Sequence, residues 1–204
     1  MQICPSGYGV GARSTSSDDQ FDGSGMADQG IVWVTYNYRA GPFGWLALPE
    51  LSAENARNIS GNYGLLDQIE VLKWIKENIA AFGGNPDRVT TVGQSFGSGA
   101  VLHQINSPLG KGLIVGVIAE SGIKDPYDPE MGSYGSTHVN YTFLYPFCEI
   151  YQSSLNVSTI PELRAMTTDE LLEGTGVSAF GAGFDSWICD SHDVRRKLAS
   201  RPCK

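Results

Sequence analysis

The stretch Gly93-Gln94-Ser95-Phe96-Gly97 reads Gly-x-Ser-x-Gly, which is the pattern of a nucleophile elbow. In an elbow the serine lies on a sharp turn between a strand and a helix, and small residues at both ends let the backbone close beneath the hydroxyl. The amide that follows the serine lies at a helix N-terminus, where it can stabilise an oxyanion. The pattern therefore predicts Ser95 as a catalytic nucleophile and the Phe96 amide as an oxyanion donor.

The segments around this stretch have the composition of alternating strands and helices. The β-branched run 88–92 follows the turn-rich residues 83–87, and residues 98–105 contain no proline and can form a helix. Runs 31–36 and 113–119 are typical of strands that are covered on both faces. Upstream of the elbow, apolar residues recur at spacings of three and four and predict one buried helical stripe, formed by Leu65, Ile69, Leu72, Ile75, Ile79 and Phe82. This alternation predicts an α/β fold with a doubly wound, mostly parallel sheet.

Longer stretches resemble the type-B carboxylesterase/lipase family of α/β-hydrolases. They are VTYNYRAGPFG at 34–44, GNYGLLDQ at 61–68, Trp74-Ile75, AFGGNPDRVT at 81–90 and AESG at 119–122. The resemblance covers about residues 20–125, and similarity to fungal-type secreted members continues to about residue 180. It implies an α/β-hydrolase fold, a small-molecule carboxylic ester as substrate, an acyl-enzyme on Ser95 and no cofactor.

The chain departs from the family pattern at its predicted oxyanion hole. The family usually has Glu before the serine and Ala after it, whereas this chain has Gln94 and Phe96. The family's His-Gly-Gly-Gly loop corresponds here to Cys4-Pro5-Ser6-Gly7, so the resemblance assigns the Ser6 and Gly7 amides as the remaining oxyanion donors. Proline has no N–H to offer, and the loss of one such donor costs on the order of 10²–10³ in turnover. The resemblance therefore implies impaired activity.

The general base is unassigned. In the family the acid and the histidine follow the nucleophile, in chains more than twice this long. His103 lies about 12 Å along the predicted helix from Ser95, which indicates a structural role. His138 lies in a segment with no family counterpart, and His192 follows the serine in an unfamiliar context, beside Asp185, Asp190 and Asp193. The chain is therefore expected to be a truncated carboxylesterase; the alternative is a non-catalytic remnant or an interaction protein on the same scaffold.

The organisation predicted is one partial α/β-hydrolase domain over residues 1–184 and an atypical basic tail over residues 185–204. The tail is set apart because residues 193–204 are basic in an otherwise acidic chain. The sheet is expected to be incomplete, because the family's N-terminal strands are missing before residues 31–36. We expect an open side on that strand and marginal solubility.

Composition excludes several classes of partner. A formal net charge of −8 argues against nucleic-acid binding, because phosphate contacts need clustered lysine and arginine. No apolar run approaches the ~18 residues of a membrane span. The cysteines show neither Cys-x-x-Cys nor histidine-interleaved spacing, so no metal site is expected, and isolated thiols or a single disulfide are both compatible with Cys4, Cys148, Cys189 and Cys203. Oligomeric state is left open.

The signals for cellular location conflict. Three glycosylation sequons indicate the secretory route: Asn58-Ile59-Ser60, Asn140-Tyr141-Thr142 and Asn156-Val157-Ser158. The family resemblance also favours an extracellular protein. The residues Met1–Pro5, however, have neither the basic nor the apolar region of a signal peptide. The compartment therefore stays open.

Overall fold

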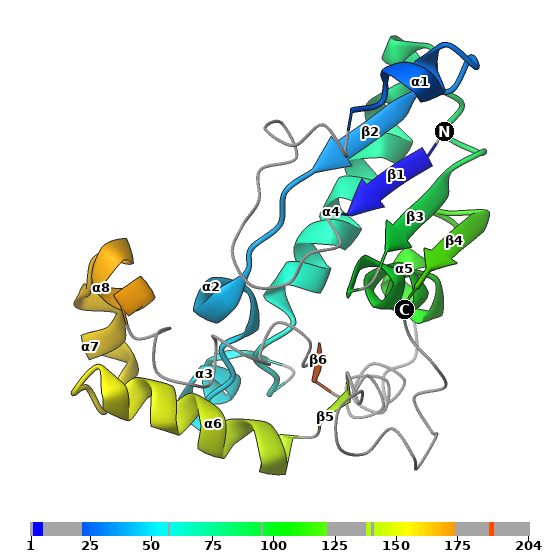
Figure 1. Ribbon diagram of the computed structural model, residues 1–204. Coiled ribbons are helices and arrows are strands. Elements are labelled where there is room, and N and C mark those ends of the chain that lie inside the picture. Colours follow the sequence, from blue (N-terminus) through cyan, green and yellow to red (C-terminus); the bar gives the residue numbers. More distant parts are fainter. Residues whose placement is uncertain are drawn as a thin grey trace. The chain divides into compact units, whose positions relative to one another are not determined.

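The computed structural model describes residues 2–5, 22–56, 58–94, 96–121, 138–139, 141–173 and 188–189. The chain divides into two compact units. The first comprises Met1–Arg39 and Gly64–Asp128, and the second comprises Ala40–Tyr63 and Pro129–Lys204. A parallel sheet with its helices forms the first unit, whereas helices and a short strand pair form the second (Figure 1).

The first unit is built on a four-stranded parallel sheet with the order β2-β1-β3-β4. Its strands are β1 (Gln2–Pro5), β2 (Trp33–Tyr36), β3 (Thr90–Gln94) and β4 (Gly116–Glu120). The three strands expected from the sequence are present and parallel, with β2 and β4 shorter than the apolar runs that predicted them. The parallel α/β fold class is confirmed.

β1 was not expected. It lies between β2 and β3, and it pairs with β2 from Gln2↔Trp33 to Pro5↔Tyr36. The expectation that no strand precedes residues 31–36 was therefore wrong. Ile3 is the one β-branched residue of β1, and proline is uncommon inside strands because it removes a ladder donor. Within the described part of the sheet, β2 and β4 are the two edge strands.

β4 is more exposed than its apolar sequence indicated. Its last three residues are exposed, including Ile118 at 37%, and Val115 just before the strand is exposed at 69%. The expectation that this strand is covered on both faces was wrong in this unit. β4 is an edge strand among the described residues, and side chains at the edge of a sheet have fewer neighbours to cover them than those of a central strand, which an apolar run does not reveal.

Two helices supply most of the apolar cover in the first unit. They are α4 (Tyr63–Asn78), continued by the 3-10 helix η2 (Ile79–Phe82), and α5 (Phe96–Asn106). The stripe predicted on α4 and η2 packs against Tyr36 and Val89 through Ile69, Leu72, Ile75 and Ile79. The shorter elements of this unit are α1 (Ser24–Ala27) and the 3-10 helix η3 (Pro108–Gly110).

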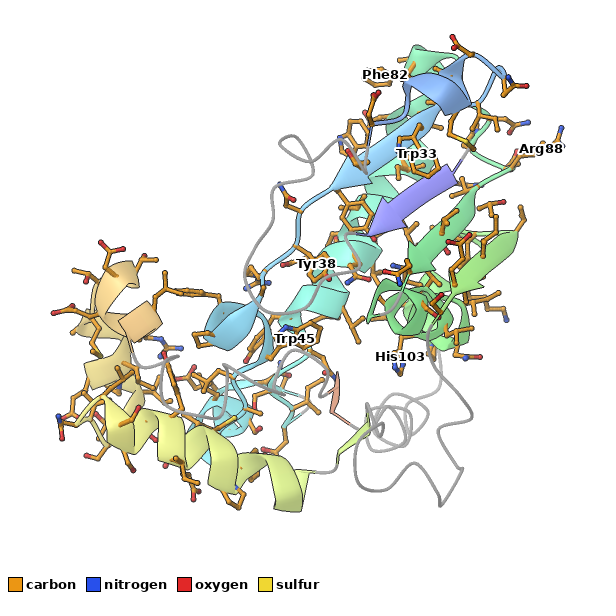
Figure 2. The ribbon with its side chains drawn as sticks, in the orientation of Figure 1. Trp33, Tyr38, Trp45, Phe82, Arg88 and His103 are labelled. Atoms are coloured by element: carbon orange, nitrogen blue, oxygen red, sulfur yellow. The ribbon has the colours of Figure 1, made fainter. Side chains whose placement is uncertain are left out.

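Phe82 does not belong to the buried stripe. Its side chain, labelled in Figure 2, is 63% exposed. It packs against the half-exposed Trp74, with ring centroids 5.9 Å apart. Phe82 is the last residue of η2, and the chain turns away at Gly83, whose φ is 80°. No further helical turn covers the ring, so the predicted stripe ends at Ile79.

The second unit contains five helices and one strand pair in its described part. The helices are α2 (Gly41–Trp45), α3 (Pro49–Glu54), α6 (Tyr141–Ser154), α7 (Ile160–Ala165) and α8 (Thr168–Glu173), and the parallel strands are β5 (His138–Val139) and β6 (Ile188–Cys189). α7 begins with a capping box between Thr159 and Glu162. Arg164 on α7 forms a forked ion pair with Glu54 on α3. A hydrogen bond also joins α3 to α6, because the Ser52 hydroxyl lies 2.9 Å from the Tyr145 hydroxyl.

The boundary expected near residue 185 stays a prediction. Of the basic tail over residues 185–204, only Ile188–Cys189 lie within the described residues. Across the described ranges, no helix has the length and apolar character that a membrane span requires.

Candidate functional site

The strand β3 and the helix α5 follow each other in the sequence with one residue between them. β3 ends at Gln94 and α5 begins at Phe96, two residues earlier than the expected helix start. Ser95, the predicted nucleophile, lies outside the described residues, as do Ser6 and Gly7, the predicted oxyanion donors. The flanking elements are those that an elbow requires, and the roles of the three residues stay predictions.

Gly93 and Gly97 approach each other closely across this turn. Both are buried, and a Cβ atom built on Gly93 would overlap the carbonyl group of Gly97 and lie 2.8 Å from the Ser98 amide nitrogen. Backbone atoms cannot rotate out of the way as a flexible side chain can. The absence of a side chain at Gly93 is therefore a steric requirement of the turn.

The C-terminal ends of β1 and β3 lie at the same edge of the sheet. The two strands are parallel neighbours, with Gln2 paired to Thr90 and Ile3 to Thr91. β2 lies on the other side of β1, so the strand order reverses between β1 and β3. In open α/β sheets, ligands bind at the carboxyl ends of the strands at such a switch point. The residues that follow these two strands in sequence are Ser6, Gly7 and Ser95.

A polar position on β4 adjoins the end of β3. Gln94 pairs in register with Glu120, and both residues are exposed. Ser121, which follows β4, has a φ of 50° in the left-handed region. The chain thus leaves β4 through a constrained turn at the same edge of the sheet as the elbow.

α5 holds the elbow turn against the sheet. The helix packs on β1, β3 and β4, and its residues Ser98, Ala100 and Val101 are fully buried. The dipole of a helix places partial positive charge at its first turn, which begins here at Phe96. The predicted role of the Phe96 amide is consistent with this placement.

The described histidines do not supply an obvious base. His103 lies in the last turn of α5 (Figure 2), which at the rise of a helix is about 10 Å along the axis from Phe96. Its predicted structural role agrees with this position. His138 lies in β5 of the second unit, and His192 lies outside the described residues. The general base is therefore still unassigned.

A forked ion pair fastens the loop after β2 to α4. Arg39 donates through Nε to Asp67 Oδ2 at 2.8 Å and through NH2 to Oδ1 at 2.7 Å, and its amide adds a third bond at 3.0 Å. Partial burial alone raises the pKa of Asp67, but the hydrogen bonds and the charge of Arg39 outweigh it and hold that pKa below its usual value. Both residues belong to the stretches that carry the family resemblance.

Cys148 is a buried free thiol on α6. Its sulfur accepts a hydrogen bond from the Ala47 amide at 3.3 Å. Burial raises the pKa of this thiol to about 12, so it is protonated at neutral pH and is a poor nucleophile or metal ligand. Among the described residues, no group of three or more His, Cys, Asp or Glu side chains is placed to hold a metal ion.

Comparison with known proteins identifies the family. Residues 3–139 match the carboxylesterase family. The chain belongs to this family. Similar proteins include the fumonisin B1 esterase of Sphingopyxis macrogoltabida, 48% identical over 115 residues, and the para-nitrobenzyl esterase of Bacillus subtilis strain 168, 36% identical over 158 residues. These alignments cover 56% and 77% of this chain, and 21% and 29% of the relatives.

Solved structures of the same family show the same fold. The Geobacillus stearothermophilus carboxylesterase EST55 superposes with a TM-score of 0.73 at 29% identity, over 90% of this chain and 39% of its own. A PNB esterase gives a TM-score of 0.72 at 30% identity, over 93% of this chain and 38% of its own. The α/β-hydrolase fold class is thereby confirmed. The chain spans between about a fifth and two fifths of the length of these relatives.

Sequence reasoning missed one group of buried polar residues beside the elbow helix. Gln68 on α4 and Gln104 on α5 are buried and contact each other. The sequence contains a signal for the burial of Gln68, because this residue lies four positions before Leu72 and one before Ile69. That spacing places it on the same face of the helix as the predicted apolar stripe. No comparable signal marks Gln104.

Proposed function

We propose that this chain carries the nucleophile-bearing part of a serine hydrolase that cleaves small-molecule carboxylic esters. Membership of the carboxylesterase family supports the reaction class. The observation that carries the proposal is the succession of β3 and α5, in which the backbone of Gly97 lies close against Gly93. In this proposal residues 1–184 form a partial α/β-hydrolase domain and residues 185–204 a basic tail.

The mechanism proposed is acyl transfer through Ser95. Its hydroxyl attacks the ester carbonyl as a general base accepts the proton, and the carbonyl oxygen becomes an oxyanion. The Phe96 amide, and the amides of Ser6 and Gly7, donate hydrogen bonds to that oxygen. The alcohol then leaves with a proton, and water hydrolyses the acyl-enzyme. The α5 N-terminus favours the negative charge that develops.

The names of the similar proteins support the substrate class. Fumonisin B1 esterase and para-nitrobenzyl esterase are both named for ester substrates. The net charge of −8 on this chain does not favour polyanionic substrates such as nucleic acids. A neutral or cationic small ester is the substrate that this charge favours.

Hydrolysis of a short-chain aryl ester tests the proposal. We expect the purified chain to turn over about 10³–10⁴-fold more slowly than an enzyme with an intact triad, since a serine without its base keeps only binding and oxyanion stabilisation. Ser95→Ala should remove this activity, whereas Ser153→Ala, at an exposed position of α6, should not.

The outcome for His192→Ala separates the alternatives. Robust turnover that both Ser95→Ala and His192→Ala abolish would identify His192 as the base. Turnover that neither substitution changes would be background, and the chain would then be a non-catalytic member on the same scaffold. Covalent labelling of Ser95 by a fluorophosphonate, read by mass spectrometry, reports the reactivity of the serine without a need for turnover.

A further inference from the structure

Three polar side chains meet in the interior of the first unit, and we call them the amide cluster: Tyr36 on β2, Gln68 on α4 and Gln104 on α5. Gln68 is fully buried, Gln104 is 1% exposed and Tyr36 is 8% exposed. Gln104 Nε2 donates to Gln68 Oε1 at 2.7 Å and to the Tyr36 hydroxyl at 3.2 Å. The cluster thus connects the elbow helix to its neighbouring helix and to an edge strand.

Two atoms of the amide cluster have no hydrogen-bond partner among the described residues. They are the donor Gln68 Nε2 and the acceptor Gln104 Oε1, and both are buried. Rotating both amide groups by half a turn exchanges their oxygen and nitrogen atoms but still leaves one N–H group and one carbonyl oxygen unpaired. The need for one further acceptor and one further donor is therefore independent of how the amides are oriented.

A third unpaired group lies on the same face of the sheet. Thr91 on β3 is fully buried and its Oγ1 has no partner in the described structure. Side chains two residues apart on a strand share a face, so Thr91 lies on the face of Gly93, which meets α5 at Gly97. The layer between β3, α4 and α5 thus contains unpaired polar groups of both kinds.

We propose that the amide cluster binds an ordered internal water molecule, and that Gln68 and Gln104 are positioning residues for the elbow helix. Water is the small ligand that both accepts from an N–H group and donates to a carbonyl oxygen. Leaving both groups buried and unpaired costs more than immobilising one water molecule, so the hydrated cluster is the more stable state. The positioning role rests on the proposed function, because it concerns the helix that follows Ser95.

The geometry explains why this cluster bears on the elbow. Gln104 lies two helical turns from Phe96 on the same rigid helix, so a shift of α5 at Gln104 is transmitted to its first turn. The fully buried residues Ala100 and Val101 of α5 are apolar, and apolar packing restricts sliding less specifically than directed hydrogen bonds do. The amide cluster therefore fixes the register of α5 against α4.

Paired methionine substitutions test the proposal, since methionine resembles glutamine in length but lacks its polar atoms. Gln68→Met and Gln104→Met should each lower Tm, because each leaves its partner amide unpaired. The double variant should recover part of this loss. In all three variants, hydrogen exchange of the α5 amides should accelerate about ten-fold or more relative to the rest of the unit. Gln152→Met, at a buried glutamine of the second unit, is the matched control.

Two readouts separate this inference from the proposed function. Exchange of the α5 amides does not depend on catalysis, so unchanged exchange in the double variant would overturn the positioning role even if Ser95 is active. A crystal structure of the chain that resolves ordered waters should show one water molecule in contact with both Gln68 and Gln104. The water site would be overturned if the space beside the two amides were empty, or if a protein side chain occupied it instead. If the role is correct, fluorophosphonate labelling of Ser95 should slow in the double variant without a change in apparent affinity.

Discussion

Replacing Gly93 with alanine puts a methyl group where the two ends of the elbow meet. The added Cβ would overlap the Gly97 carbonyl group and lie 2.8 Å from the Ser98 nitrogen. Normal contact between such atoms is about 3.5 Å, so even the longest of these contacts requires a shift of about 0.7 Å. The obstructing atoms are backbone, so β3 or α5 must move as a whole.

The expected cost follows from overpacking a buried site. Forced shifts of this kind typically destabilise by about 1–3 kcal/mol, which for a chain of this size lowers Tm by about 2–12 °C. Displacement of a reacting group by about 1 Å can also cost on the order of 10² in rate. We therefore expect Gly93→Ala to lower both Tm and the rate at which Ser95 reacts with a fluorophosphonate.

Thermal unfolding and labelling of the same preparations measure these effects. Gly25→Ala is the matched control, because nothing lies within 4 Å of a Cβ at that helical position. Alanine should be neutral or slightly stabilising there. A Gly93→Ala chain with the Tm and the labelling rate of the unsubstituted protein would refute the steric account of the elbow.

Three further predictions concern the ion pair, the buried thiol and the tail. Arg39→Ala should destabilise by about 0.5–1 kcal/mol at pH 7, a figure reduced for the exposure of the pair. Because the pKa of Asp67 is lowered in the folded state, this stabilisation is present above about pH 4 and is lost as the pH falls through the folded-state pKa; urea titrations at pH 7 and pH 3 should show the difference between the two proteins shrink. Cys148 should resist iodoacetamide at pH 8 until the chain unfolds, as peptide mapping can show, and rapid labelling of the native chain would contradict its burial. Amides from Asp185 onward, apart from those of the short strand β6, should exchange quickly, since their composition breaks with the preceding chain, and core-like protection would contradict the predicted tail.

The sequence was most informative where a local pattern repeats. The apolar spacing of Leu72, Ile75 and Ile79 predicted the buried face of α4, and β-branched runs predicted β2 and β3. The Gly-x-Ser-x-Gly pattern predicted a change from strand to helix, and β3 ends at Gln94 while α5 begins at Phe96. These features depend on interactions between residues near in sequence, and they can therefore be read from the sequence.

Features that depend on distant residues were missed. The sequence Gln2–Pro5 contains one β-branched residue and a proline, so it carries no strand pattern, and it becomes a strand because β2 and β3 lie on either side of it. Phe82 continues the stripe in sequence, but η2 ends at this residue and its side chain stays 63% exposed. The contact between Gln68 and Gln104 joins residues 36 positions apart and leaves no trace in either local segment.

The sequence by itself determined the family, the parallel α/β class and the position of the elbow, because each is encoded in contiguous motifs or in the period of apolar residues. Only the tertiary structure decided that β1 lies beside β3, that a Cβ at Gly93 would meet the Gly97 backbone, and that two buried glutamines hold α5 against α4. Strand order and side-chain contacts are set by the packing of segments far apart in the chain. Local composition does not encode that packing.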